Sequence, residues 1–207
     1  MVTQTKSATR RPSLSPEQIR AKILDAAADC LVDGGFASGR LLSAIARKAG
    51  LSRPTLYKYG GTIDDIKQAL LERELAAFLD ALAPRLRTLT WTVDSIADLL
   101  IFIVGYARGH TLLNAALRDV PELVLPVFTL QAAGPIRLIT EMAEPIVQEQ
   151  IDNGSLPPVD VPVLTDVLFR VTLSTVLIRS DLDFDDPATL RSYLHTAINF
   201  AAELPAS

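Results

Sequence analysis

The chain has 207 residues, of which 49% are hydrophobic and 21% charged, so it can form one large domain or a small domain fused to a larger one. Its only cysteine, Cys30, excludes a disulfide within the chain and suits a reducing compartment. The longest apolar run, Leu99 to Ala107, is far shorter than the roughly 20 residues that span a bilayer. No signal peptide is recognised, and we expect a cytoplasmic protein.

The net charge of −4 hides a strong asymmetry. Residues 1–60 contain ten basic and four acidic residues, a net charge of +6, whereas residues 61–207 contain ten basic and twenty acidic residues, a net charge of −10. A basic head on an acidic body is typical of proteins whose head binds a polyanion. Chance clustering of charge is the alternative.

The first segments predict an arm followed by a helix. Residues 1–14 are polar and include Arg10 and Arg11, which we interpret as a flexible basic arm. Ser15 and Gln18 form a capping-box pattern at the start of a helix that ends at Gly34-Gly35. Its buried stripe is predicted from residues at helical spacing: Ile19, Ile23, Ala27, Cys30 and Leu31.

Two short helices follow, and they carry the most informative pattern in the chain. The first covers 41–48, and Gly50 suits the turn after it. Ser52 caps the second, in which Leu56 is expected to point inward, and Gly60-Gly61 ends it. This is the layout of a helix-turn-helix, whose second helix lies in the major groove of DNA.

The rest of the chain predicts helices only. Thr62 starts a fourth helix that reaches Leu82 or Arg85. Asp186 caps the last helix, with Pro187 at its first position. No convincing strand pattern is present, so the predicted fold is all-α, and the further helices are expected at 93–108, 111–118, 121–130, 135–152, 161–179 and 187–203.

Several short motifs in residues 15–70 together resemble the DNA-binding head of the tetracycline-repressor (TetR) family of bacterial transcription regulators. The body resembles the family's six-helix ligand and dimerisation domain in its helix pattern alone. The motifs are Ile23-Leu24-Asp25-Ala26-Ala27, Gly35-Phe36, Ile45-Ala46, Ala49-Gly50-Leu51-Ser52 and Thr55-Leu56-Tyr57-Lys58-Tyr59.

The resemblance implies a homodimer that binds a palindromic operator, usually represses, and releases DNA when a small molecule enters the body. We therefore divide the chain into a basic arm at 1–14, a DNA-binding head at 15–61 and a ligand-binding and dimerisation body at 62–207. The family's DNA-facing positions fall on Ser43, Arg53, Pro54, Thr55, Tyr57, Lys58 and Tyr59.

Three residues depart from the family's pattern. Leu41 stands where the family usually has a phosphate-binding threonine, and Gly60 where it has an aromatic or branched apolar residue. Ile63 replaces a frequent lysine. One anchor on the DNA backbone is therefore missing, which leaves open a rival class: a small-molecule-binding or protein-binding module whose head no longer reads DNA.

The chemistry of the head residues suggests a role for each. Arg53 can place a bidentate pair of hydrogen bonds on guanine, and Pro54 and Thr55 can pack on a thymine methyl group. Tyr57, Tyr59 and Lys58 can contact phosphates. Arg10 and Arg11 can reach the minor groove. The alternative is an ordinary solvated basic face.

Bulky apolar residues in the body predict a pocket for a hydrophobic or amphipathic ligand, although ordinary core packing explains them as well. The apolar candidates are Trp91, Phe102, Tyr106, Phe128, Met142 and Phe169, and the polar ones are Arg108, His110, Asn114, Gln131 and Arg137.

The last two helices carry more apolar surface than a monomer can bury, which predicts a homodimer. Candidate interface residues are Val163, Val167, Arg170, Val171, Leu194 and Ile198. We expect no enzyme, cofactor or metal site. Asp181, Asp183 and Asp185 have the spacing that opens a calcium loop, but Asp186 and Ser192 occupy the positions of its glycine and glutamate.

Overall fold

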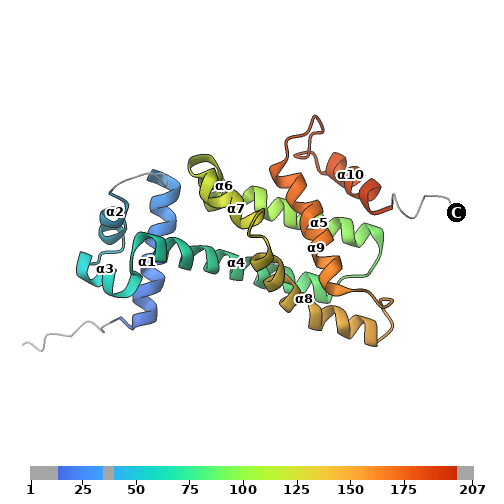
Figure 1. The fold of residues 1–207 in the computed structure, drawn as a ribbon, viewed down its shortest axis with the longest axis horizontal. Helices are drawn as coiled ribbons and strands as arrows, with labels where there is room; N and C mark the ends of the chain where they lie inside the picture. Colours follow the sequence, from blue (N-terminus) through green and yellow to red (C-terminus); the bar gives the residue numbers. More distant parts are fainter. Residues whose placement is uncertain (1–13, 35–39, 200–207) are drawn as a thin grey trace, which may run out of the picture.

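The computed structural model describes residues 14–34 and 40–199. Arg10, Arg11, the Gly35-Phe36 motif and the predicted helical residues 200–203 lie outside this range. The described residues form ten helices and no strand, which confirms the all-α prediction (Figure 1). The helices are α1 Pro16–Gly34, α2 Leu41–Lys48, α3 Arg53–Gly60, α4 Ile63–Arg87, α5 Val93–Gly109, α6 Thr111–Asp119, α7 Pro121–Phe128, α8 Ala133–Asp152, α9 Val161–Leu177 and α10 Pro187–Asn199.

The predicted helix starts are confirmed by their capping hydrogen bonds. The Ser15 N–H donates to Gln18 Oε1 at 2.9 Å, and the Gln18 N–H donates to Ser15 Oγ at 3.2 Å. The Thr62 N–H donates to Asp65 Oδ2 at 2.8 Å, and the Asp65 N–H donates to Thr62 Oγ1 at 3.2 Å. These bonds satisfy N–H groups that have no partner within the helix.

Two helices end earlier than the sequence predicts. α7 stops at Phe128 because the Gln131 N–H donates to the Pro126 carbonyl at 2.7 Å and closes a wider turn. α9 stops at Leu177, and Ile178 takes an extended conformation with φ −90° and ψ 124°. α4 continues to Arg87, slightly beyond its predicted end.

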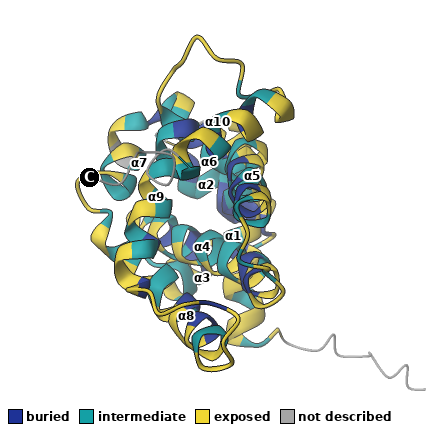
Figure 2. Ribbon diagram, turned by 90° about the vertical axis from the view of Figure 1, so that its right-hand side faces the viewer, coloured by how far each residue is buried: buried dark blue, intermediate teal, exposed yellow. Residues whose placement is uncertain are grey.

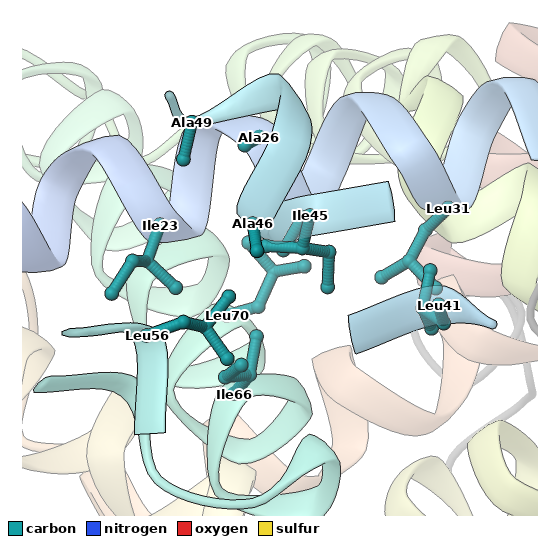
Figure 3. Packing of buried hydrophobic residues seen from close by; sticks show 11 residues of the cluster. Ile23, Ala26, Leu31, Leu41, Ile45, Ala46, Ala49, Leu56, Ile66 and Leu70 are labelled. Carbon is teal, nitrogen blue, oxygen red and sulfur yellow. The ribbon is translucent and has the colours of Figure 1, made fainter. Parts of the chain in front are cut away.

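The head is one hydrophobic cluster formed by α1, α2, α3 and the first turns of α4 (Figure 3). Leu56, the only buried residue of α3, is 0% exposed and points toward Ile66 and Leu70 of α4. An isolated helix of eight residues is unstable in water, so tertiary packing must hold α3 in place.

The body consists of α4 to α10 and has two clusters of its own. One joins the end of α4, through Leu82, Ala83 and Leu86, to α5, α8 and α9. The other joins α5 to α10. Figure 1 shows α4 running from the head into the body, and Figure 2 shows exposed residues on the outer sides of the helices. Head and body therefore share one continuous helix.

No single described helix has the length and apolar character needed to cross a membrane; only α5 and α6 taken together, with a 61° bend between them, reach those values.

Gly60 is the point of closest approach between the end of α3 and its neighbours. A Cβ atom built there lies 3.2 Å from Ile23 Cγ2 of α1 and 3.3 Å from Ile66 Cδ1 of α4. The larger side chain that the resemblance leads one to expect would require Ile23 and Ile66 to shift. The departure at Gly60 is therefore explained by close helix packing within the head.

We predict that Gly60→Val lowers the free energy of unfolding by about 1–3 kcal/mol, because the added atoms overpack the junction of α1, α3 and α4. Gly105, inside α5, is the control, since a Cβ there meets nothing within 4 Å. Gly105→Ala should raise stability by about 0.5–1 kcal/mol. Urea unfolding followed by circular dichroism measures both; an unchanged midpoint for Gly60→Val would refute the packing explanation.

Candidate nucleic-acid interface and cavity

The turn between α2 and α3 has the geometry that its sequence predicts. Gly50 has φ +67°, a conformation that glycine adopts without strain. The Leu51 N–H donates to the Ala46 carbonyl at 2.9 Å, and the Thr55 N–H donates to Ser52 Oγ at 3.3 Å. Both ends of the turn are thus fixed, and the direction of α3 is fixed with them.

The outer face of α3 presents most of the predicted DNA-contacting residues. Arg53, Pro54 and Lys58 are exposed, and the side chain of Tyr57 is 51% exposed although it is large and partly apolar. Thr55 is half-buried, and its Oγ1 lies 2.8 Å from Ser52 Oγ. The buried Leu56 and this exposed face together define an amphipathic helix.

Ser43 and Arg53 are brought together across the turn. Ser43 is half-buried on α2, and the Arg53 guanidinium donates a hydrogen bond to its Oγ. The sequence predicts both as DNA-facing residues without predicting their contact. The hydrogen bond holds the guanidinium at the junction of α2 and α3, on the side where α3 is exposed.

Tyr59 lies differently from the other residues of α3. It is half-buried, and its ring packs against the head cluster. Lys58 Nζ stands 5.2 Å from the centroid of that ring, within the range of a cation–π interaction. Its role as a phosphate contact stays a prediction, while its packing role is evident.

The other two departures from the family's pattern are also explained by packing. Leu41 is only 5% exposed and belongs to the head cluster, and Ile63 packs against the same cluster. A polar side chain at 41 would lose this burial. Leu41 and Ile63 are therefore part of the packing of the head.

Lys48 forms ion pairs within the head. Its Nζ lies 3.1 Å from Asp29 and 3.3 Å from Asp33, so it ties α2 to α1, and these carboxylates raise the pKa of Lys48. Cys30 is half-buried, and burial raises the pKa of its thiol, which agrees with a packing role instead of a reactive one.

The body contains a cavity of about 780 Å³, partly open to solvent, between α4, α5, α6, α7, α8 and α9. Its volume falls within the range of small-molecule sites, roughly 300–1,000 Å³. The predicted pocket residues that line it are Trp91, Tyr106, His110, Phe128, Gln131, Met142 and Phe169.

Four predicted pocket residues lie elsewhere, and each has another partner. Phe102 packs under Arg85, whose Cζ is 3.7 Å from the ring centroid. Arg108 bonds to Asp185 at 2.5 Å and to the Thr175 carbonyl at 2.9 Å. The carbonyl of Arg108 accepts a hydrogen bond from Asn114 at 2.6 Å, and Arg137, an exposed residue of α8, pairs with Glu141 at 3.8 Å.

A polar network that sequence reasoning missed leads from the cavity to the head. His110 Nδ1 accepts the Leu113 N–H at 3.2 Å and caps α6. A neutral imidazole therefore carries its proton on Nε2, which donates to Glu74 Oε2 at 3.2 Å. Arg73 bonds to Glu74 at 3.0 Å and to Asp25 of α1 at 2.7 Å.

The predicted dimer residues divide into two groups. Val163 and Val167 of α9 are 57% and 50% exposed, and Arg170 on the same face pairs with Asp166 at 2.6 Å. Val171 and Ile198 pack against the cluster between α5 and α10, and Leu194 is 0% exposed within it. The prediction for Leu194 is wrong, because its own chain already covers it completely.

The acidic loop that precedes α10 has a structural role. Asp186 Oδ2 accepts the Thr189 N–H at 2.9 Å and caps the helix, as predicted. Asp185 is the partner of Arg108. Among the described residues, no group of three or more His, Cys, Asp or Glu residues is placed to hold a metal ion.

The geometry defines a class: an all-helical protein with a helix-turn-helix head and a hollow helical body. Residues 23–70 match the model of the bacterial regulatory proteins of the tetR family. No curated protein matches the chain. Residues 23–70 therefore carry the DNA-binding domain of the TetR family of transcriptional regulators.

Solved structures share the fold along nearly the whole chain. The TetR-family repressor AlkX of Dietzia sp. is 19% identical, with a TM-score of 0.59, over 88% of this chain and 94% of AlkX. A protein of Mesorhizobium loti assigned to the family is 13% identical, with a TM-score of 0.66, over 91% and 96%. RolR, in complex with resorcinol, is 17% identical, with a TM-score of 0.58, over 93% and 96%.

The match of the head gives the general function. It indicates a DNA-binding regulator, similar to a family whose members are typically ligand-responsive repressors. These regulators are not enzymes, which confirms that part of the sequence prediction.

We predict that Arg53→Ala weakens binding to operator DNA by about 1–3 kcal/mol and relaxes sequence preference, since the expected base contact is lost. Lys58→Ala should weaken all duplexes alike and lower the salt slope by about one unit, since the expected phosphate contact is lost. Arg137→Ala is the control, because it removes the same charge from the body. Fluorescence anisotropy with two duplexes at several salt concentrations measures all three. Equal losses on both duplexes for Arg53→Ala would argue against base reading.

Proposed function

We propose that the chain is a homodimeric repressor that binds a palindromic operator in the bacterial cytoplasm and is released from it by a small hydrophobic or amphipathic molecule. The observation that carries the proposal is the position of α4. This helix completes the core of the DNA-binding head and also lines the cavity of the body. A molecule that fills the cavity therefore acts on a helix whose start is part of the head.

DNA binding rests on the charge and exposure of the head. The net charge of residues 1–60 is +6, and the exposed Arg53 and Lys58 lie on the outer side of α3. Phosphate neutralisation supplies most of the affinity, and base edges supply the sequence preference. Because Leu41, Gly60 and Ile63 are explained by packing within the head, they do not favour the rival module with a degenerate head.

The dimer rests on the exposed side of α9. Val163 and Val167 project there beside Pro162, Asp166 and Arg170, which line a surface hollow between α8 and α9 of about 670 Å³. An apolar strip with paired charges beside it is the composition of an interface between identical chains. Two such chains present two heads, as a palindromic operator requires.

Two contacts between body and head can transmit the state of the cavity. α6 packs against α1, and Leu112 at its start contacts the head cluster. The network of His110, Glu74, Arg73 and Asp25 joins the cavity wall to α1 through α4. A ligand that binds better to one arrangement of α4 and α6 shifts the population of heads spaced for the operator. RolR, which has the same fold, is known with resorcinol bound, and this supports a ligand in the body.

We expect the purified chain to shift a duplex taken from upstream of its own gene at a lower concentration than an unrelated duplex of equal length. The reason is that base contacts add to the phosphate contacts common to both. A gel shift with unlabelled competitor measures the ratio, and sedimentation of the complex gives two chains per operator. Equal affinity for both duplexes would favour the rival interpretation, a module whose head no longer reads DNA.

A second prediction concerns the link between cavity and head. For a compound that stabilises the chain in a thermal-shift screen and weakens operator binding, Asp25→Asn should reduce that weakening about 1.5- to 5-fold. This is the effect of losing a partly exposed ion pair worth roughly 0.2–1 kcal/mol. Asp29→Asn is the matched control, because Asp29 lies one turn further along α1 and binds Lys48 inside the head. Equal effects of the two variants would exclude this route.

A further inference from the structure

The charged residues on the cavity wall are confined to one end. Asp64, Lys67, Glu72 and Glu74 all lie on the first half of α4, beside the head. Each has a partner: Asp64 and Lys67 pair at 3.8 Å, Gln68 donates to Glu72 at 2.9 Å, and Glu74 binds Arg73 and His110. This end is acidic in sum, and its charges are already neutralised or solvated.

Apart from the imidazole of His110, which bonds to Glu74, the rest of the wall is uncharged. Between Trp91 and Leu177, no Asp, Glu, Lys or Arg among the described residues lines the cavity. A carboxylate or an ammonium group placed there would lose its water and gain no opposite charge, which is strongly unfavourable. An anionic ligand would also meet three carboxylates and a single lysine at the charged end.

One buried polar atom on this uncharged wall lacks a partner. Thr172 of α9 lines the cavity and is 8% exposed, and its Oγ1 is buried without a hydrogen bond. An unpaired buried hydroxyl costs free energy, and in a helix threonine divides between two χ1 rotamers. Rotation about χ1 moves the hydroxyl to another of the three staggered positions on Cβ, where a molecule in the cavity can supply the missing partner.

We propose that the ligand is an uncharged, mostly hydrocarbon molecule with a hydroxyl or carbonyl group that hydrogen-bonds to Thr172. Apolar contacts with residues such as Phe128, Met142 and Phe169 supply most of its affinity, and the hydrogen bond to Thr172 fixes its orientation. The inference rests on the proposed function, because it concerns the same cavity and names the class of molecule that fills it.

The test uses three probes that share one ten-carbon chain: 1-decanol, decanoate and decylamine, the last two charged at neutral pH. Trp91, the chain's only tryptophan, lines the cavity, and its Nε1 donates to Gln150 at 2.9 Å, so its fluorescence reports occupancy. We expect 1-decanol to bind the intact chain at least tenfold more tightly than either ion. Equal or tighter binding of decanoate or decylamine, or no binding of any probe, overturns the proposal.

Two matched variants test the hydrogen bond. Thr172→Val keeps the shape of the side chain and should weaken 1-decanol binding about two- to tenfold, the effect of one neutral hydrogen bond. It should not destabilise the empty chain, because the hydroxyl it removes has no partner. Thr175→Val is the control: Thr175 is buried one turn away, bonds to the Thr172 carbonyl at 2.7 Å, and should leave the affinity for 1-decanol unchanged.

An unchanged 1-decanol affinity in Thr172→Val, or an equal loss in both variants, overturns the assignment of this hydroxyl. The titrations use the chain without DNA, so their failure is distinct from failure of the proposed function. A chain that binds its operator but none of the probes remains a DNA-binding regulator, with a ligand of another class.

Discussion

The packing of α4 into two hydrophobic clusters is the constraint on which the rest of the structure depends. Ile66 and Leu70 complete the head, and Leu82, Ala83 and Leu86 help to close the core of the body. The backbone hydrogen bonds of α4 resist bending along most of its length, and the proline inside the helix, Pro84, lies near its end. The two functions proposed for the chain, DNA binding and ligand binding, therefore meet in one helix.

The short helix α3 depends on the rest of the head for its stability. α3 has eight residues and buries only Leu56, so it depends on the Ser52 cap, the Gly50 turn and the close approach at Gly60. All of these act on its inner side or its ends, which leaves the outer side free for charged and polar groups. The residues that depart from the family's usual pattern belong to this inner scaffold. They change the packing within the head and leave the exposed face of α3 in place.

The local features of this fold could be predicted from sequence, and the long-range contacts could not. Apolar periodicity and caps such as Thr62 with Asp65 are set by residues a few positions apart, so the helices and the direction of Leu56 were predictable. Arg108 was expected in the cavity because its partner, Asp185, lies 77 residues away and could not be predicted from the neighbouring sequence. Glu74 and His110, 36 residues apart, were missed for the same reason. Periodicity also shows which side of a helix is buried but not what covers it, which is why Leu194 was expected at a dimer interface.

Hydrogen exchange of the intact chain, with and without a duplex from upstream of its own gene, tests the central claim most directly. Coupling between sites is reciprocal, so DNA that binds the head must also alter the cavity helices. The account predicts slower exchange in residues 41–60, together with a change in residues 66–74 and 110–117, where α4 and α6 join the two parts. Unchanged exchange in residues 41–60 would contradict the assignment of the DNA-binding face, and a change confined to those residues would contradict the coupling through α4.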